Sequence, residues 1–254
     1  MTVCYNNSMS IQPILQLQNI HKRFGAVTAL DGMNLHVVPG EILAIVGDNG
    51  CGKSTLMKVG CGVIQPDQGH IVCNGKPLQG LQPKEALKAG ISAVYQDLAL
   101  DPMRDCAGNI FLGKEITSFP FFIDHKSMRR KTEQLLHELS IHIPDITQPA
   151  GSLSGGQRQS LAIARAMHEK TPIMFFDEPT SAMGVRESAK ILDLLRHLRE
   201  EGIAVIIISH NLFQVFDVAD RVTVMAAGKK VADVLCSEST PEEVNQFILR
   251  GRAK

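Results

Sequence analysis

The chain has 254 residues, enough for a sizeable core in one large domain or in one domain with a sub-domain. Its 26 basic residues balance its 26 acidic ones, so charge does not favour nucleic acid as a partner, and six scattered cysteines without C-x-x-C spacing predict reduced thiols in a cytosolic protein. No apolar run approaches the roughly 20 residues that span a bilayer. The polar start lacks the regions of a signal peptide, and we expect residues 1–12 to be a disordered tail.

Two strands are predicted before the first motif. Apolar and polar residues alternate over residues 15–20, as in a half-buried strand, and residues 29–38 predict a second strand closed by a Pro39-Gly40 turn. Phe24 lies between them. An aromatic ring at the end of a strand either joins the core or offers a face on which an adenine ring can stack.

The first motif is a glycine-rich turn between a strand and a helix. Residues 42–46 form an apolar run that predicts a buried parallel strand, and a helix-forming segment follows at residues 55–58. The turn has the spacing G-x-x-x-x-G-K-S of a phosphate-binding loop. Its residues are Gly47, Asp48, Asn49, Gly50, Cys51, Gly52, Lys53, Ser54 and Thr55.

The chemistry of this loop favours a nucleoside triphosphate. Glycines let the backbone curl so that its N–H groups point inward, and the helix N-terminus adds a partial positive charge. Lys53 can then reach the β- and γ-phosphates, and the Ser54 hydroxyl can ligate Mg²⁺. The alternative is a glycine-rich turn without a ligand, which leaves the complete match to the pattern unexplained.

The middle of the chain changes character. Residues 71–75 and 91–95 predict two further strands, the second of which ends at Gln96. From about residue 97 to residue 167 there are few strand-like runs and much helical periodicity, strongest over residues 127–139. We predict a mostly helical sub-domain inserted into an α/β body.

A second candidate anion site lies near the end of this helical region. The run Leu153-Ser154-Gly155-Gly156-Gln157 opens a predicted helix. Ser154 is placed as its N-cap, and the two glycines expose backbone N–H groups at the positive helix terminus. A simple capped helix is the alternative, and it explains the serine but not the paired glycines.

The last part of the chain returns to alternating strands and helices. Strands are predicted at residues 172–176, 204–208, 222–225 and 230–234, and helices at residues 185–201 and 241–249. The first of these strands ends in Asp177-Glu178, and the second ends in Ser209-His210. Because open α/β sheets bind ligands at the carboxyl ends of their strands, we expect these side chains to meet near the phosphate loop.

The acidic pair and the histidine then have distinct roles. We expect Asp177 to hold Mg²⁺, commonly through water, and Glu178 to polarise the water that attacks the γ-phosphate. His210 would hydrogen-bond the γ-phosphate and hold Glu178 in place. The alternatives are an acidic pair that is merely solvated and a histidine with a structural role.

Taken together, these residues resemble the ATP-binding cassette ATPases from about residue 15 to residue 235. That family has a fixed order of an aromatic adenine stacker, phosphate loop, glutamine loop, L-S-G-G-Q signature, D-E pair and switch histidine. The matching positions here are Phe24, residues 47–55, Gln96, residues 153–157, Asp177-Glu178 and His210. The signature is the discriminating element, because other phosphate-loop ATPases lack it.

The resemblance implies a fold and a cofactor set. The fold is an α/β body over residues 13–254, with a mostly parallel core sheet, an N-terminal antiparallel β region and the helical sub-domain inserted at about residues 97–167. ATP and Mg²⁺ are implied as ligands, and the residues implied to bind the metal are Ser54, Gln96 and Asp177. Lys53, Gln96, Glu178 and His210 are implied as the catalytic side chains. In that fold the signature faces the phosphate loop of a partner subunit, so that a homodimer encloses two ATP molecules.

Finer features resemble one branch, the bacterial importers of monosaccharides such as ribose, xylose and fructose. The run from Glu178 to Ser188 and the triplet Ser209-His210-Asn211 carry this likeness. Most of those ATPases have two cassettes in one chain, whereas this chain has one, as some fructose-type members do. It ends soon after His210, and we therefore expect no β-barrel regulatory domain of the oligosaccharide-importer kind.

Two positions depart from the usual family pattern. Cys51 stands where a small unreactive residue is usual, and its place beside Lys53 and a helix N-terminus predicts a lowered thiol pKa. We therefore expect Cys51 to alkylate faster than Cys73 or Cys236 and to be protected by MgATP. Gly184 replaces an aspartate that helps to link the two sites, which puts their coupling in doubt, although the sugar branch shares this glycine.

The resemblance implies an ATPase subunit that powers a monosaccharide importer from the cytoplasmic face of the inner membrane. Its partners would be a second copy, two permease subunits and, indirectly, a sugar-binding protein outside the membrane, with no nucleic acid. The alternatives are an importer of another small solute and a non-transport cassette of DNA repair or the ribosome. The zinc cysteines, long insertions or charged linkers of the latter are not in the sequence. A non-hydrolysing regulator would need the loss of Lys53, Glu178 or His210.

Overall fold

The structure is a computed structural model that describes residues 12–119, 122–181 and 183–252. The predicted disordered tail therefore falls, except for Gln12, outside the described residues. In the described part of the chain, no helix is both long enough and apolar enough to cross a membrane.

The strands form two sheets. A four-stranded antiparallel sheet has the order β2-β1-β4-β5. Its strands are β1 (Leu15–Phe24), β2 (Val27–Val37), β4 (Gln68–Cys73) and β5 (Lys76–Leu78). A six-stranded sheet has the order β10-β9-β3-β8-β7-β6, in which only β9 and β10 pair antiparallel. Its strands are β3 (Ile42–Gly47), β6 (Ile91–Val94), β7 (Ile173–Asp177), β8 (Ala204–Ile208), β9 (Arg221–Ala226) and β10 (Lys229–Leu235).

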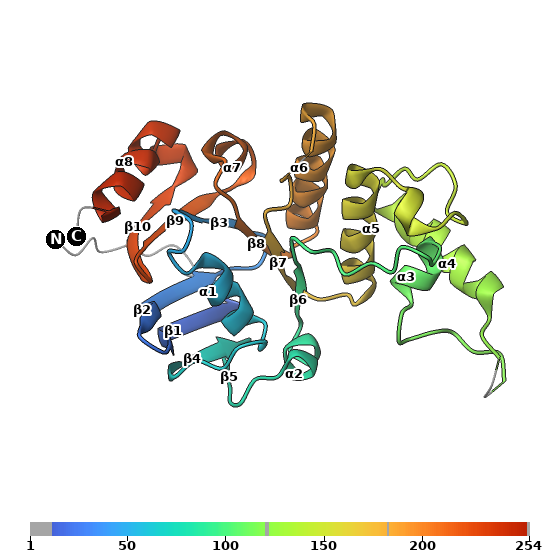
Figure 1. Ribbon diagram of the computed structural model, residues 1–254, viewed down its shortest axis with the longest axis horizontal. Helices are drawn as coiled ribbons and strands as arrows, with labels where there is room; N and C mark the ends of the chain where they lie inside the picture. The colour runs from blue at the N-terminus through green and yellow to red at the C-terminus, as the bar shows by residue number, and fades with distance from the viewer. Residues whose placement is uncertain (1–11, 120–121, 182, 253–254) are drawn as a thin grey trace.

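The central strands β3, β7 and β8 of the larger sheet are buried on both faces, which explains their continuous apolar runs. Alternate residues of β3 join two separate core clusters: Ile42 and Ala44 face one, while Leu43 and Ile45 face the other. The second cluster also contains the inner face of the antiparallel sheet and α1 (Lys53–Gly60), which lies between the two sheets (Figure 1).

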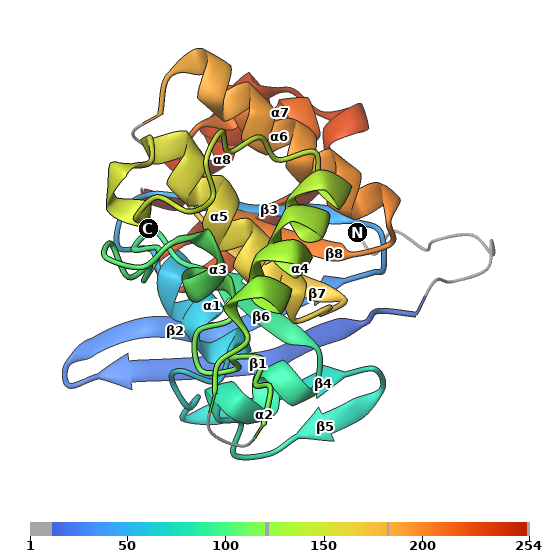
Figure 2. The ribbon, with the colours of Figure 1, turned by 90° about the vertical axis from the view of Figure 1, so that its right-hand side faces the viewer.

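The opposite face of the larger sheet is covered by helices. These are α5 (Gly155–His168), α6 (Val185–Glu200), α7 (Leu212–Val218) and α8 (Pro241–Arg252). Figure 2 shows α6 and α7 on the side of β3 away from the antiparallel sheet. The predicted apolar face of α6 is confirmed, since Ile191, Leu195 and Leu198 are buried.

A group of helices lies at one end of the molecule, beyond β6 (Figure 1). It contains α3 (Cys106–Ile110), α4 (His125–Glu138) and the short 3-10 turn η1 (Ala150–Ser152), packed against α5. These helices lie within the predicted helical region, whose limits as a sub-domain stay a prediction. The sequence patterns did not predict β5, α2 (Pro83–Lys88) or α7.

Candidate active site

The glycines of the phosphate loop are required by close backbone contacts. Gly47 and Gly52 have φ values of 151° and 105°, which residues other than glycine rarely adopt. A Cβ atom on Gly47 would lie 2.2 Å from the carbonyl oxygen of Met225, and one on Gly52 would lie 2.3 Å from that of Ala29. The loop is therefore held between the backbones of β9 and β2, and larger residues do not fit.

The lysine of the loop lies inside the curl of the backbone. Its side chain is buried, and its ammonium group donates hydrogen bonds to the carbonyl oxygens of Gly47 and Asp48, each at 2.8 Å. The loop thus places a positive charge next to the backbone N–H groups at the start of α1. This arrangement is suited to an anion with several negative charges.

The prediction that the Cys51 thiol has a lowered pKa is wrong. The side chain is buried, and this burial raises the pKa of the thiol above its ordinary value even though Lys53 opposes the shift. The Lys53 ammonium lies 3.9 Å from the Cys51 sulfur. Desolvation outweighs the nearby positive charge, so the predicted lowering of the Cys51 thiol pKa is wrong, while the order of alkylation of Cys51, Cys73 and Cys236 stays a prediction.

Asp177 meets Ser54 beside the phosphate loop. Burial raises the pKa of the Asp177 carboxyl group, while a hydrogen bond from Ser54 and the charges of Lys58 and Lys53 act in the opposite direction. Among the described residues, no three His, Cys, Asp or Glu side chains form a metal-binding group. A hydroxyl and a carboxylate nevertheless fit Mg²⁺, which takes few protein ligands when phosphate oxygens supply the others.

Glu178 and His210 form a direct pair. Oε1 of Glu178 accepts a hydrogen bond from Nδ1 of His210 at 2.8 Å, although the two residues are 32 positions apart. The histidine side chain is 67% exposed and the glutamate side chain 17% exposed. The two strands β7 and β8 are neighbours in the sheet, and this pairing brings their carboxyl ends together.

Glu178, His210 and the start of the phosphate loop line one cavity of about 450 Å³, whereas Lys53, Ser54 and Asp177 are not among its lining residues. Its lining consists of Gly47, Asp48, Asn49, Gln96, Glu178, Ser181 and His210. Ser181 was not predicted as a site residue, although it lies in the run from Glu178 to Ser188 that carries the likeness to the monosaccharide importers. Its N–H and its hydroxyl both donate to the carbonyl oxygen of Glu178, at 3.1 and 2.9 Å, and so fix the turn that follows the acidic pair.

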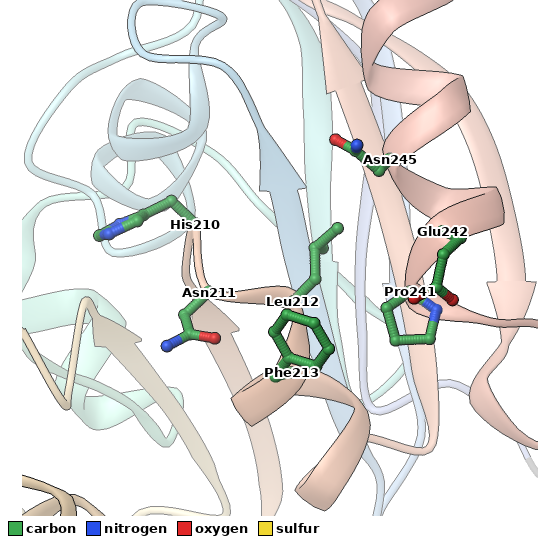
Figure 3. A pocket seen from close by; sticks show the side chains of 7 residues that line it. All are labelled: His210, Asn211, Leu212, Phe213, Pro241, Glu242 and Asn245. Atoms are coloured by element: carbon green, nitrogen blue, oxygen red, sulfur yellow. The ribbon is translucent and has the colours of Figure 1, made fainter.

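A second hollow, of about 430 Å³, lies on the other side of His210 (Figure 3). Phe213 and the start of α8 at Pro241 and Glu242 line it. The imidazole of His210 is directed away from Phe213 and Pro241 in Figure 3. The hydrogen-bonding edge of His210 therefore belongs to the cavity that contains Glu178.

The signature residues are not part of that cavity. Ser154, Gly156 and Gln157 line a separate space of about 640 Å³ beside α6, and Gly155 has open space above it. Ser154 caps α5 as predicted, with its hydroxyl accepting from the Gln157 N–H at 3.2 Å. One chain thus does not bring its own signature to its own phosphate loop.

Phe24 lies at the end of β1 and is 49% exposed, so the possibility that it is a core residue is wrong. It pairs with Val27 at the start of β2. Ala29 follows two residues later on β2, and its carbonyl oxygen is the atom that a side chain on Gly52 of the phosphate loop would meet. The ring is therefore on the hairpin that borders the loop.

A buried lysine in a glycine-rich loop, followed by an acidic pair at the end of a parallel strand, defines a phosphate-loop nucleotide hydrolase of the α/β class. The family described as "ABC transporter" matches residues 30–181. The chain belongs to the ABC transporter family. The resemblance and the fold predicted from the motifs are thereby confirmed.

Individual relatives agree with this assignment. The chain is 42% identical to the xylose/arabinose import ATP-binding protein XylG of Sulfolobus acidocaldarius, covering 92% of this chain and 93% of that one. It is 40% identical to the fructose import ATP-binding protein FrcA of Rhizobium meliloti, covering 94% and 95%. A dimeric ATP-binding cassette bound to ADP and phosphate matches with a TM-score of 0.75 and 26% identity, covering 87% of this chain and 98% of the other.

Proposed function

We propose that this chain is the ATP-hydrolysing subunit of a monosaccharide importer. The observation that supports hydrolysis is the single cavity that joins the phosphate loop to Gln96 and to the hydrogen-bonded pair Glu178–His210. The likeness to xylose/arabinose and fructose import proteins along nearly their full length supports the sugar branch.

Each side chain has a role that its position allows. The backbone of residues 47–55 and the Lys53 ammonium bind the β- and γ-phosphates. Ser54, Asp177 and Gln96 would hold Mg²⁺, which would neutralise charge on the phosphates. Glu178 orients and polarises the attacking water, and His210 holds the Glu178 carboxylate through its 2.8 Å hydrogen bond.

The site is completed by a second copy of the chain. The signature residues Ser154, Gly155, Gly156 and Gln157 lie outside the cavity of their own chain. In the proposed homodimer they contact the nucleotide bound to the partner. Two such copies act beneath two permease subunits, at the cytoplasmic face of the inner membrane, as peripheral subunits. Gln96, at the start of the helical region, transmits the nucleotide state to the permease.

The first test concerns Glu178. Glu178→Gln keeps the size of the side chain but removes the charge that polarises water, so turnover should be nearly abolished while ATP affinity changes within a few-fold. The variant should also accumulate as an ATP-bound dimer. ATPase assays, equilibrium binding and size-exclusion chromatography measure these three properties. A variant that retains more than about a tenth of the parent rate, a barrier change below ~1.4 kcal/mol, would show that Glu178 is not the catalytic carboxylate.

A further inference from the structure

The residues before Phe24 break the regular pairing of β1. The β1–β2 register shifts between Ile20 and Lys22 and again between Lys22 and Arg23, and the β1–β4 pairing ends at His21 and Gln68. Such irregularities in a ladder bend the strand and redirect the side chain that follows. The direction of the Phe24 ring therefore also depends on the contacts that hold the strand at these irregularities.

Asp67, directly before β4, supplies these contacts to three consecutive residues. Its own N–H donates to the carbonyl oxygen of His21 at 2.8 Å. One carboxylate oxygen accepts from the Lys22 ammonium at 2.7 Å, and the other accepts from the Arg23 N–H at 2.7 Å. The hydrogen bond from Lys22, and to a smaller extent that from the Arg23 N–H, hold the pKa of the Asp67 carboxyl group below its ordinary value.

Lys22 connects this carboxylate to the aromatic ring. Its ammonium lies 5.6 Å from the centroid of the Phe24 ring, within the range of a cation–π contact. The lysine side chain is mostly covered, whereas the Phe24 side chain is 49% exposed. Because the lysine occupies one side of the ring, the accessible side is the one that can receive a planar group.

We propose that Asp67 is a positioning residue of the nucleotide site: it fixes the backbone at residues 21–23 and holds Lys22 against Phe24, so that the ring is a preoriented platform for the base of the nucleotide. The inference rests on the proposed function, because it concerns the same ligand. Asp67 acts through Phe24 and does not itself touch the nucleotide. The contribution of Asp67 to the binding free energy of a nucleotide therefore depends on the base of that nucleotide and not on its phosphates.

This dependence separates the proposal from a merely structural role. Asp67→Asn keeps the shape but places an amide group opposite the Lys22 ammonium, so the ion pair is lost. The dissociation constant of MgATP should rise about five-fold, within the range for the loss of an aromatic stack, while that of magnesium tripolyphosphate stays within about two-fold. Isothermal titration calorimetry on the full chain measures both constants.

The chain offers a control away from β1. Asp217 on α7 forms an ion pair with Arg196 at 2.7 Å, the same distance as that between Asp67 and Lys22. Asp217→Asn should leave both constants within two-fold of the parent values. The double variant Phe24→Ala/Asp67→Asn should bind MgATP with the same dissociation constant as Phe24→Ala, because Asp67 acts on nucleotide binding only through the Phe24 ring.

A fluorescence experiment gives an independent measurement. The chain has no tryptophan, so Phe24→Trp introduces a single reporter on the platform itself. MgATP should quench it and magnesium tripolyphosphate should not, and adding Asp67→Asn should shift the MgATP midpoint upward about five-fold. The proposal is overturned if Asp67→Asn binds MgATP as the parent does, or if both ligands weaken equally. A parent protein that binds neither ligand would instead overturn the proposed function.

Discussion

Glu178 carries backbone strain at the centre of the site. Its φ of 52° is in the left-handed region, where an L-residue costs roughly 1–2 kcal/mol. The conformation is held by the Glu178 N–H, which donates to the carbonyl oxygen of Ile208 at 2.9 Å, and by the two hydrogen bonds from Ser181 to the Glu178 carbonyl oxygen. The chain thus turns sharply after β7 and keeps the carboxylate beside His210.

Replacing Glu178 by glycine should remove this strain. We expect Glu178→Gly to be about 1 kcal/mol more stable than Glu178→Ala in urea unfolding, because both variants lack the carboxylate and only alanine retains the disfavoured φ. Both should be inactive as ATPases. If the glycine variant is no more stable than the alanine variant, the turn at residue 178 is not strained.

At this scale the sequence located most of the candidate site residues. Strand ends and the glycine pattern were sufficient to place Lys53, Glu178 and His210 near one another, because parallel strands share one carboxyl edge. Asp67 and Ser181 could not be found in this way. Their contacts depend on a bulge and on a strained turn, and neither feature has a periodic signal in the sequence.

Among the elements, the two sheets are joined by a charged network around Arg221 on β9. Its guanidinium donates to Glu41 at 2.7 Å, to Asp233 on β10 at 2.8 Å, and to the carbonyl oxygen of His36 on β2 at 2.7 Å. The arginine side chain is only 11% exposed. Burial alone would raise the pKa of Asp233, but Arg221 and Lys230 together hold that pKa below its ordinary value of 3.8.

This network predicts a pH-dependent contribution to stability. Because the pKa of Asp233 is lowered on folding, its stabilisation is present above pH 3.8 and is lost as the pH falls through the folded value. Asp233→Asn should cost about 1–2 kcal/mol at pH 7, and the difference from the parent should shrink toward pH 3. Urea unfolding at a series of pH values tests this. Asp193→Asn, at an exposed pair with Arg196, is the control and should have little effect at any pH. A constant difference for Asp233→Asn across the series would contradict the assignment.

The elements differ in how far the sequence could predict them. Continuous apolar runs identified β3, β7 and β8, and the apolar face of α6 was clear from Ile191 to Leu198. The missed elements are short: β5 has three residues, α2 has six and α7 has seven. Such segments contain too few residues to show a period, and tertiary packing decides their structure.

For the whole molecule, the separation of the signature from the phosphate loop leads to a complementation test. Lys53→Ala and Gly156→Asp should each disable both sites of their own homodimer. In a mixed dimer both lesions fall in one site, and the other site has intact parts from both chains. Mixed dimers purified with two tags should trap close to one nucleotide per dimer with vanadate, and the homodimers almost none. Equal trapping in all three species would mean that each chain completes its own site.

The proposed sharing of the site between two chains would also make the rate of hydrolysis depend on the concentration of dimer. If the signature serves the nucleotide of a second copy as proposed, the ATPase activity per chain would fall in dilute solution as pairs dissociate, since Ser154 and its neighbours lie outside the cavity of their own phosphate loop. In the proposed transporter, two copies bound to the same membrane subunits would experience a local concentration set by geometry, which for short tethers is in the millimolar range. Unattached copies would then consume little ATP, and hydrolysis would be confined to assembled transporters.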